Sequence, residues 1–407
     1  MSFQTGLSGL NASAKNLDVI GNNIANSNTV GAKSSRAEFS AVVASALGAS
    51  SGGGAGGAGI GVEISTISQQ FSQGTINITG NSLDCAVNGG GFFQLTLKDG
   101  SAAYTRDGQF KLDSKGNLVT NAGSNVMGFT TDVSGTPTST TPTKLNIPTG
   151  APIAAKQTDS ITAEFNLDAR VPVAATATPP TPYTTYGTTM NAYDSQGVAV
   201  PVKLYFIKTA TDAWDVYDGD PAAGATLISP LTFDTSGNLL TPAAPGIVPV
   251  TLTSTNTNIG TFTADLDLSK ATQYGTSFAI SDLTQNGYTA GTLTGISISE
   301  QGVVTTRYSN GQSQASGQLA LADFRNVQGL KPVGQNNWVE TSASGQPIQG
   351  SPGQGNFGAI NSGALEASNV DLTAELVAMM TAQRDYQSNA QTIKTQDTVL
   401  QTLVNMR

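Results

Sequence analysis

Residues 372–404, LTAELVAMMTAQRDYQSNAQTIKTQDTVLQTLV, and residues 3–24, FQTGLSGLNASAKNLDVIGNNI, carry apolar side chains at alternating spacings of four and three residues. This spacing places them on one face of a helix, as in the seam of a coiled coil. Each stripe is stabilised only when another helix covers it, so we expect a subunit that polymerises through its two ends. The expected assembly interface consists of Phe3, Leu7, Leu10, Leu17, Ile24, Leu372, Leu376, Met379, Tyr386, Ile393, Leu400 and Val404.

Polar residues interrupt the C-terminal stripe at Gln383 and Asp397. A buried polar residue in a coiled-coil seam costs stability but can fix register and partner number. One alternative stays open, in which residues 3–24 and 372–404 form a helical hairpin within one subunit. Because two helices cover only one face of each other, we expect further partners even then.

The start of the C-terminal helix has recognisable end signals. Ser368 and Asp371 fit the S-x-x-D capping pattern. Glu366 and Glu375 place negative charge near the expected helix start, where the helix dipole favours it.

Between the two ends the sequence is typical of β-structure and turns. Residues 48–61 are rich in glycine and are expected to form a flexible loop. Alternating apolar residues then begin at 62–67 and 75–79, which predicts strands. Turn dipeptides such as Asn88-Gly89 and Asp99-Gly100 recur about every ten residues, as in a meandering β-domain.

These changes divide the chain into nested domains. We expect a helical core from residues 1–30 and 364–407, and an extended connector with the glycine-rich loop at 31–79. An inner β-domain is expected from 80–145 and 285–363, because hairpin signals of one style occur on both sides of residues 146–284. That segment, which Pro- and Thr-rich stretches introduce, is expected to be an inserted outer β-domain. The predicted fold class is mixed and mainly β, with a coiled-coil core of terminal α-helices.

Composition excludes several classes of function. Charged residues make up 12% of the 407, about half the usual share, and the net charge is -9 without a basic run. These values argue against binding to nucleic acid or to an anionic membrane surface. The sequence has no apolar segment of the roughly 20 residues that a membrane-spanning helix needs, and no recognisable cleavable signal at its start.

The sequence gives little support for catalysis, a cofactor or a metal site. Histidine is absent, and the single cysteine, Cys85, lies in an apolar run that predicts burial in a core. The spacing Gly52-x-Gly54-x-x-Gly57 fits a dinucleotide-binding pattern, but no strand precedes it. We interpret Arg106 and Asp107 as the charged residues of a turn.

Three short segments resemble parts of calcium loops but lack the later glutamate, so we expect β-turns there. They begin at Asp113, Asp194 and Asp234.

Both ends of the chain resemble a known family. The run from Leu17 to Ser27, LDVIGNNIANS, is similar to the N-terminal signature of bacterial flagellar rod and hook proteins, and 355–407 resembles their C-terminal signature. NGGGFF at 88–93 and YTRDGQF at 104–110 resemble the inner β-domain of that family. Length and residues 202–217 are similar to hook subunits rather than to the shorter distal rod subunits.

The resemblance implies a helical tube between rod and filament that acts as a universal joint and transmits torque. It implies a homopolymer whose partners are the distal rod protein, the hook–filament junction protein, the hook cap and the flagellar type III export apparatus, which exports subunits without cleavage. It implies an extracellular location in the flagellar hook. Family members commonly have an aromatic residue near Ala32, so the start of the connector is expected to pack differently here.

Two alternative kinds of structural protein fit the sequence less well. A distal rod protein would form a straight, rigid shaft, and the large inserted domain argues against it. A secreted β-rich adhesin or tail-fibre subunit would not need matched signatures at both ends. An enzyme is the least favoured class.

Overall fold

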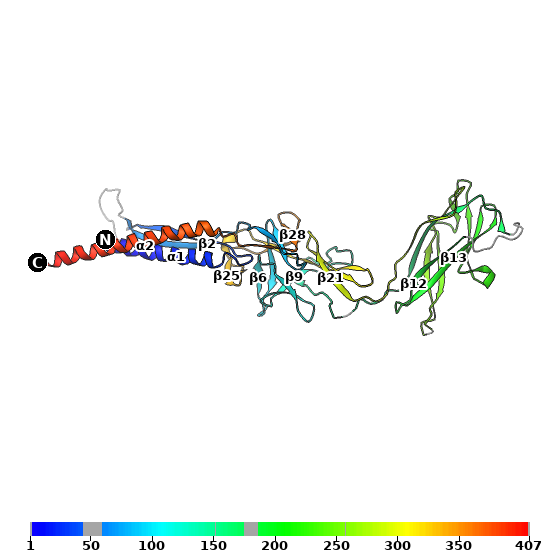
Figure 1. Ribbon diagram of the computed structural model, residues 1–407, viewed down its shortest axis with the longest axis horizontal. Helices are drawn as coiled ribbons and strands as arrows, with labels where there is room; N and C mark the ends of the chain where they lie inside the picture. The colour runs from blue at the N-terminus through cyan, green and yellow to red at the C-terminus, as the bar shows by residue number, and fades with distance from the viewer. Residues whose placement is uncertain (1, 44–58, 151, 175–185, 257, 406–407) are drawn as a thin grey trace. The chain divides into compact units, whose positions relative to one another are not determined.

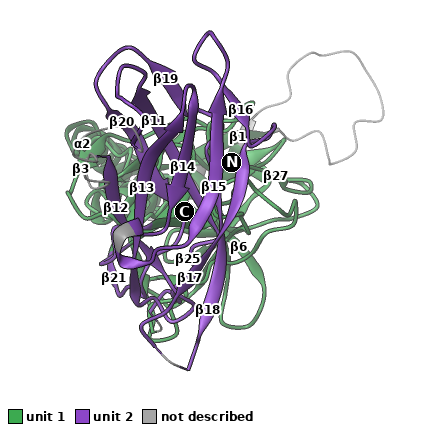
Figure 2. Cartoon of the chain, turned by 90° about the vertical axis from the view of Figure 1, so that its right-hand side faces the viewer, with its two compact units in different colours: residues 1–150, 295–307, 313–407 green, residues 151–294, 308–312 purple. Residues whose placement is uncertain are grey.

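The computed structural model describes residues 2–43, 59–150, 152–174, 186–256 and 258–405. The described residues fall into two compact units, coloured separately in Figure 2. Unit 1 contains residues 1–150, 295–307 and 313–407, and unit 2 contains residues 151–294 and 308–312. The described residues are mainly β with an α-helix at each end, which confirms the predicted mixed, mainly β fold with terminal helices (Figure 1).

The two terminal helices, α1 (Ser2–Ala25) and α2 (Leu372–Asn405), lie side by side in unit 1. Asp371 is the N-cap of α2, since its Oδ1 accepts hydrogen bonds from the backbone N–H groups of Thr373 and Ala374 at 2.9 and 3.1 Å. The proposed Ser368 capping pattern is therefore wrong in detail, because Ser368 accepts from Val370 before the helix begins. In the described part of the chain, neither helix is long and apolar enough to cross a membrane.

A β-hairpin follows α1 and packs against it. Its strands are β1 (Ser35–Val43) and β2 (Gly59–Gln69), which pair antiparallel with Ser35 opposite Gln69. Ser8 of α1 joins the hairpin to the helix, because its Oγ accepts from the backbone N–H of Val62 at 3.3 Å. The strand predicted at 62–67 is confirmed as part of β2. Most of the glycine-rich tract at 48–61 lies outside the described residues.

The β-region of unit 1 contains a large sheet in which antiparallel pairing prevails. Its strands are β5 (Phe92–Thr96), β6 (Ala102–Thr105), β7 (Phe110–Leu112), β8 (Leu118–Thr120), β9 (Asn125–Phe129), β10 (Thr143–Lys144), β21 (Leu293–Ile298), β22 (Val303–Tyr308), β23 (Ser313–Leu319), β24 (Leu321–Asp323), β25 (Lys331–Gly334), β26 (Asn337–Val339) and β27 (Ile348–Gly350). Its central order is β21-β22-β23-β9-β5-β6-β26-β25. Two small ribbons, β3 (Ile76–Ile78) with β29 (Ala364–Glu366) and β4 (Cys85–Asn88) with β28 (Ala359–Ser362), join distant parts of the chain.

Two apolar clusters fill unit 1. The larger one includes Phe93, Phe110 and Leu319 and lies under the large sheet. The smaller one, built around Phe92, Tyr104 and Trp338, is aromatic, and its rings meet edge to face. Burial of such rings stabilises a fold both by area and by ring geometry.

Aspartate turns join many strands, as the sequence predicts. Oδ1 of Asp113 accepts from the backbone N–H groups of Lys115 and Asn117, each at 2.8 Å. Asp194 and Asp234 make the same pair of bonds to the residues two and four positions further on. These carboxylates therefore stabilise turns, which confirms the interpretation as β-turns.

Unit 2 packs two described sheets around one core. Alternate residues are buried along β11 (Ser160–Asp168), β13 (Ala199–Ala210) and β18 (Thr261–Asp267), the period expected when one face of each strand meets the opposite sheet. One sheet contains β11 (Ser160–Asp168), β17 (Ile247–Thr253), β18 (Thr261–Asp267), β19 (Thr272–Tyr274) and β20 (Ala279–Gln285). The other contains β12 (Gly187–Tyr193), β13 (Ala199–Ala210), β14 (Ala213–Tyr217), β15 (Leu227–Phe233) and β16 (Leu239–Thr241).

Cys85 provides a test of the packing of unit 1. Its side chain is fully buried, and burial, together with Asp84, raises the pKa of the thiol to about 12. A thiol of this kind is a poor nucleophile because the thiolate is the reactive form. We expect iodoacetamide to leave Cys85 unmodified in the folded subunit at pH 8 and to alkylate it fully in urea, as measured by mass spectrometry. Rapid alkylation without denaturant would contradict this packing.

Candidate assembly surface and its anchorage

Much of the predicted interface is uncovered in the single chain. Leu7 on α1 is exposed, and so are Leu372, Leu376, Tyr386 and Leu400 on α2. Leu400 exposes 53% of its surface, a large fraction for a leucine on an ordered helix. The partly buried members are Leu10, Leu17, Ile24, Met379 and Ile393, and the side chains of Phe3 and Val404 lie outside the described residues.

A different face of α1 packs against α2 within the chain. A methyl group added at Gly6 would lie 3.1 Å from Cγ1 of Ile393, and one added at Gly9 would lie 3.0 Å from Oδ1 of Asn389. Small residues therefore allow the two helices to approach closely. Ile393 contributes to this contact, while most of the larger apolar residues of α2 point elsewhere.

The exposed apolar surface of α2 is also wider than the heptad stripe. Val377, Met380 and Val399 are each more than half exposed, although sequence reasoning did not select them. Met380 flanks the predicted seam, whereas Val377 and Val399 lie about 100° around the helix axis from the seam residues Leu376 and Leu400. The sequence does contain a signal for them, because three apolar residues outside the heptad positions are unusual on a helix face that is exposed to solvent. With Leu372, Leu376 and Leu400 they leave many apolar side chains of α2 in water, and large exposed apolar patches mark interaction surfaces.

Asn23 ties α1 to its two neighbours. Its Nδ2 donates to the backbone carbonyl of Ser35 at 2.8 Å and to Oε1 of Glu375 at 2.9 Å, while its Oδ1 accepts from the N–H of Ser35 at 2.8 Å. The side chain is almost fully buried. One carboxamide thus joins α1, β1 and α2. Sequence reasoning used Asn23 only as part of a signature and did not find this role.

A buried ionic cluster fixes the chain where the helices meet the β-region, and we call Lys33, Arg106 and Glu366 the junction cluster. Nζ of Lys33 lies 2.6 Å from Oε1 of Glu366, and Nη1 of Arg106 lies 3.1 Å from Oε2. Oε1 also accepts from the backbone N–H of Gly74 at 2.9 Å. All three side chains are at least nine-tenths buried.

The junction cluster corrects two interpretations from sequence. Glu366 lies in β29 and not at the start of α2, so its carboxylate pairs with cations instead of the helix dipole. Arg106 is not a turn charge, because its guanidinium is buried over the ring of Phe92 and donates to the carbonyl of Gly89 at 2.8 Å.

Glu366 is the carboxylate that both buried cations contact. Burial lowers the pKa of Lys33, Glu366 opposes this shift, and the nearby Arg106 adds to it. Burial likewise lowers the pKa of Arg106, with Glu366 acting in the opposite direction. Nε of Arg106 has no partner among the described residues. The cluster therefore holds two buried cations on one carboxylate, and that carboxylate offsets much of their desolvation cost.

Neutral hydrogen bonds surround the junction cluster. Asn369 accepts from the N–H of Ser34 at 2.7 Å and donates to the carbonyl of Gln70 at 2.7 Å. Trp338 donates from Nε1 to the side chain of Gln69 at 2.5 Å. Ala32 is buried beside the cluster and lines a cavity of about 220 Å³.

The described residues contain no group of three or more histidine, cysteine, aspartate or glutamate side chains placed to hold a metal ion. Residues 52–57, where the dinucleotide-like spacing occurs, lie outside the described part.

Four family models match consecutive parts of the chain. They describe a flagella basal body rod protein at residues 3–33, a flagellar hook protein FlgE/F/G D1 domain at 86–164, a flagellar basal body protein FlaE D2 domain at 166–288, and a flagellar basal body rod FlgEFG protein C-terminal region at 361–406. The matched regions include both helical ends and the β-structure of residues 86–164 and 166–288.

Full-length relatives agree with these models. The chain is 41% identical to the flagellar hook protein FlgE of Salmonella typhimurium and to that of Escherichia coli, with all of each chain covered. It is 34% identical to FlgE of Rhizobium meliloti, with 98% of that protein covered. The crystal structure of Helicobacter pylori FlgE2 has the same fold over 72% of this chain and all of its own, with a TM-score of 0.54 at 16% identity.

Proposed function

Because this chain belongs to the flagellar hook protein family, we propose that it is the repeating subunit of the bacterial flagellar hook, a structural protein of motility. The observation that carries the proposal is the 41% identity to hook proteins over the full length of both chains. The exposed apolar faces of α1 and α2 support it, since a lone subunit leaves them in water.

We propose that neighbouring subunits cover these faces to form a coiled-coil inner core. The intrachain contact between α1 and α2 uses small residues such as Gly6 and Gly9, which leaves larger residues such as Leu400 for other subunits. Burying a leucine contributes on the order of 1.5–3 kcal/mol. Several leucines per subunit, repeated along a polymer, provide a strong driving force for assembly.

The proposed role is mechanical and involves no catalysis. Torque enters through the inner helices, and the junction cluster passes it to the β-region of the same unit. We retain the division into an inner β-domain (80–145 and 285–363) and an outer inserted β-domain (146–284) as a proposal for the polymer. Outer domains that slide between neighbours would let each protofilament shorten and lengthen as the hook rotates.

The proposed partners follow from a position between rod and filament. They are the distal rod protein, the hook–filament junction protein, the hook cap during assembly and the flagellar type III export apparatus. We propose export without cleavage and an extracellular location in the flagellum. No nucleic acid and no membrane insertion are expected, and no cofactor is needed for this role.

A distal rod protein is the second candidate, because two of the matching models are named for rod proteins. The match of residues 166–288 to a D2 domain and the full-length hook relatives favour the hook.

Deleting the gene for this chain separates the two candidates. Electron microscopy of basal bodies from the deletion strain is expected to show a complete rod and no hook, and expression of the chain should restore a curved hook. A shortened rod would favour the distal rod protein, and an intact hook would overturn the proposal.

A further inference from the structure

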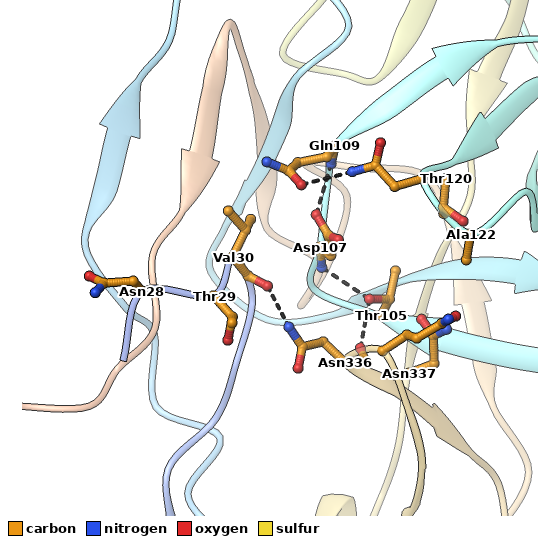
Figure 3. Close-up of a pocket in the computed structure, with 12 residues that line it drawn as sticks. Asn28, Thr29, Val30, Thr105, Asp107, Gln109, Thr120, Ala122, Asn336 and Asn337 are labelled. Carbon is orange, nitrogen blue, oxygen red and sulfur yellow. Dashed lines mark hydrogen bonds between the residues drawn. The ribbon is translucent and has the colours of Figure 1, made fainter. Parts of the chain in front are cut away.

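A polar pocket lies in unit 1 beside the end of α1, and we call it the amide pocket. Its walls are formed by residues 28–30 after α1, by Thr105 at the end of β6, by Asp107 and Gln109 before β7, by residues 120–122 at the end of β8, and by the β25–β26 turn at 335–337 (Figure 3). Its volume is about 460 Å³, within the usual range for ligand sites.

Specific bonds hold the walls of the amide pocket in place. Nδ2 of Asn336 donates to the carbonyl of Val30 at 2.8 Å, and Oγ1 of Thr105 donates to the carbonyl of Asn336 at 2.7 Å (Figure 3). Gln335 and Asn336 both have left-handed backbone angles, with φ of 56° and 54°. Positive φ at both residues is the geometry of a type I′ turn between two paired strands, so this hairpin fixes the position of residues 335–337 in the wall.

The pocket offers hydrogen-bonding groups that the chain leaves unused. The side-chain amides of Asn28, Gln335 and Asn337 make no hydrogen bond to any part of the chain that the structure describes, although all three residues line the pocket. Asn337 is only 6% exposed, so this amide is held at the wall rather than in open solvent. Each carboxamide presents two donor hydrogens and an acceptor oxygen.

The charge of the pocket limits what it can bind. Asp107 is the charged residue among the described lining residues, and burial raises the pKa of its carboxyl group, with Asp84 adding to the shift. Those lining residues include no lysine or arginine to pair with a phosphate or carboxylate. They include no aromatic ring on which a base could stack. A neutral or basic ligand rich in both donors and acceptors fits best.

A peptide backbone has these properties, because each peptide group carries one donor and one acceptor. We propose that the amide pocket holds an exposed peptide segment, neutral or basic, from a second copy of this chain. The inference rests on the proposed function, since a polymer supplies that copy at high local concentration. It adds a contact in the β-region to the helical contacts of the inner core.

Photo-crosslinking in the assembled polymer tests this contact. Asn28 is exposed at the pocket rim, so Asn28→Cys can carry a benzophenone maleimide, while Cys85 is buried and does not compete. We expect irradiation to join the label to a single segment of a neighbouring subunit, identified by mass spectrometry of isotopically mixed polymers. The same labelled subunit with Leu400→Asp serves as a control that does not polymerise, and should give no adduct between chains.

A second measurement tests the energetic role of the pocket. Asn28→Ala removes an exposed amide without disturbing a core, and is expected to raise the critical concentration for polymerisation about fivefold, the effect of one lost hydrogen bond. Polymers that form normally but give adducts only within one chain, with an unchanged critical concentration, would overturn the inference and leave the proposed function standing. Failure of the native chain to polymerise at all would overturn both.

Discussion

Glu366→Gln is expected to lower the melting temperature of unit 1 by about 10 °C. The change leaves Lys33 and Arg106 buried without a counter-charge, and breaking a buried ion pair from one side typically costs about 3–5 kcal/mol. The amide cannot replace the carboxylate. Lys33 and Gly74 donate to one oxygen and Arg106 to the other, so an –NH₂ group would meet a donor in either orientation.

Differential scanning calorimetry of the purified subunit is the measurement. Unit 2 has a separate core and provides an internal control, since its transition should not move. Glu38→Gln is the matched control variant in unit 1, because Glu38 pairs with Arg36 at the surface. In this variant the melting temperature of unit 1 should equal that of the native subunit. A shift of less than about 2 °C for Glu366→Gln would show that the junction cluster does not stabilise unit 1.

A double variant separates charge from packing. Lys33→Met together with Glu366→Gln removes one cation and the anion, so a single buried charge, that of Arg106, remains in the junction cluster. We expect this protein to melt above Glu366→Gln alone, because uncompensated charge and not lost contact accounts for most of the effect. If the decreases in melting temperature caused by the two substitutions simply add in the double variant, that explanation is contradicted.

Local patterns in the sequence predicted the elements of this fold well. Alternation at 62–67 indicated part of β2, and the spacing of apolar residues indicated both terminal helices. Asp113 and Asp234 were correctly interpreted as turn residues. In each case the deciding interactions lie within a few residues of one another, so the pattern in a short stretch of sequence is sufficient to predict the element.

Contacts between distant residues were not predictable in this way. Glu366 and Lys33 are 333 residues apart, and Glu366 and Arg106 are 260 apart. Near the expected start of a helix, a glutamate fits a favourable interaction with the helix dipole, so nothing local suggested a buried role. Asn23 is a similar case, because its three bonds reach β1 and α2.

The helices show a further limit of periodicity. A heptad pattern gives the direction of an apolar face but not the identity of the partner that covers it. Here α1 meets α2 through Gly6 and Gly9, residues that a hydrophobic pattern ignores. The intrachain hairpin uses Ile393 of the predicted seam but leaves Leu372, Leu376 and Leu400 exposed, so it does not exclude a polymer seam built from the remaining residues.

Leu400→Asp is expected to abolish polymerisation while the subunit stays folded. Leu400 is 53% exposed, so the change removes little packing within the chain, and the circular dichroism spectrum should match that of the native subunit. In the polymer we expect neighbouring helices to cover this position, and an unpaired carboxylate buried there costs several kcal/mol per subunit. Sedimentation should find the variant monomeric at concentrations many times the native critical concentration.

Thr402→Asp is the matched control for this prediction. Thr402 is exposed on the same helix, about 200° around the axis from Leu400, and the change adds the same charge near the same end of α2. Any loss of helix stability from that charge is shared by both variants. The control should therefore polymerise, while Leu400→Asp should not. If both variants assemble, Leu400 does not lie in the seam, and if neither assembles, the charge at this end of α2 matters rather than the covered face.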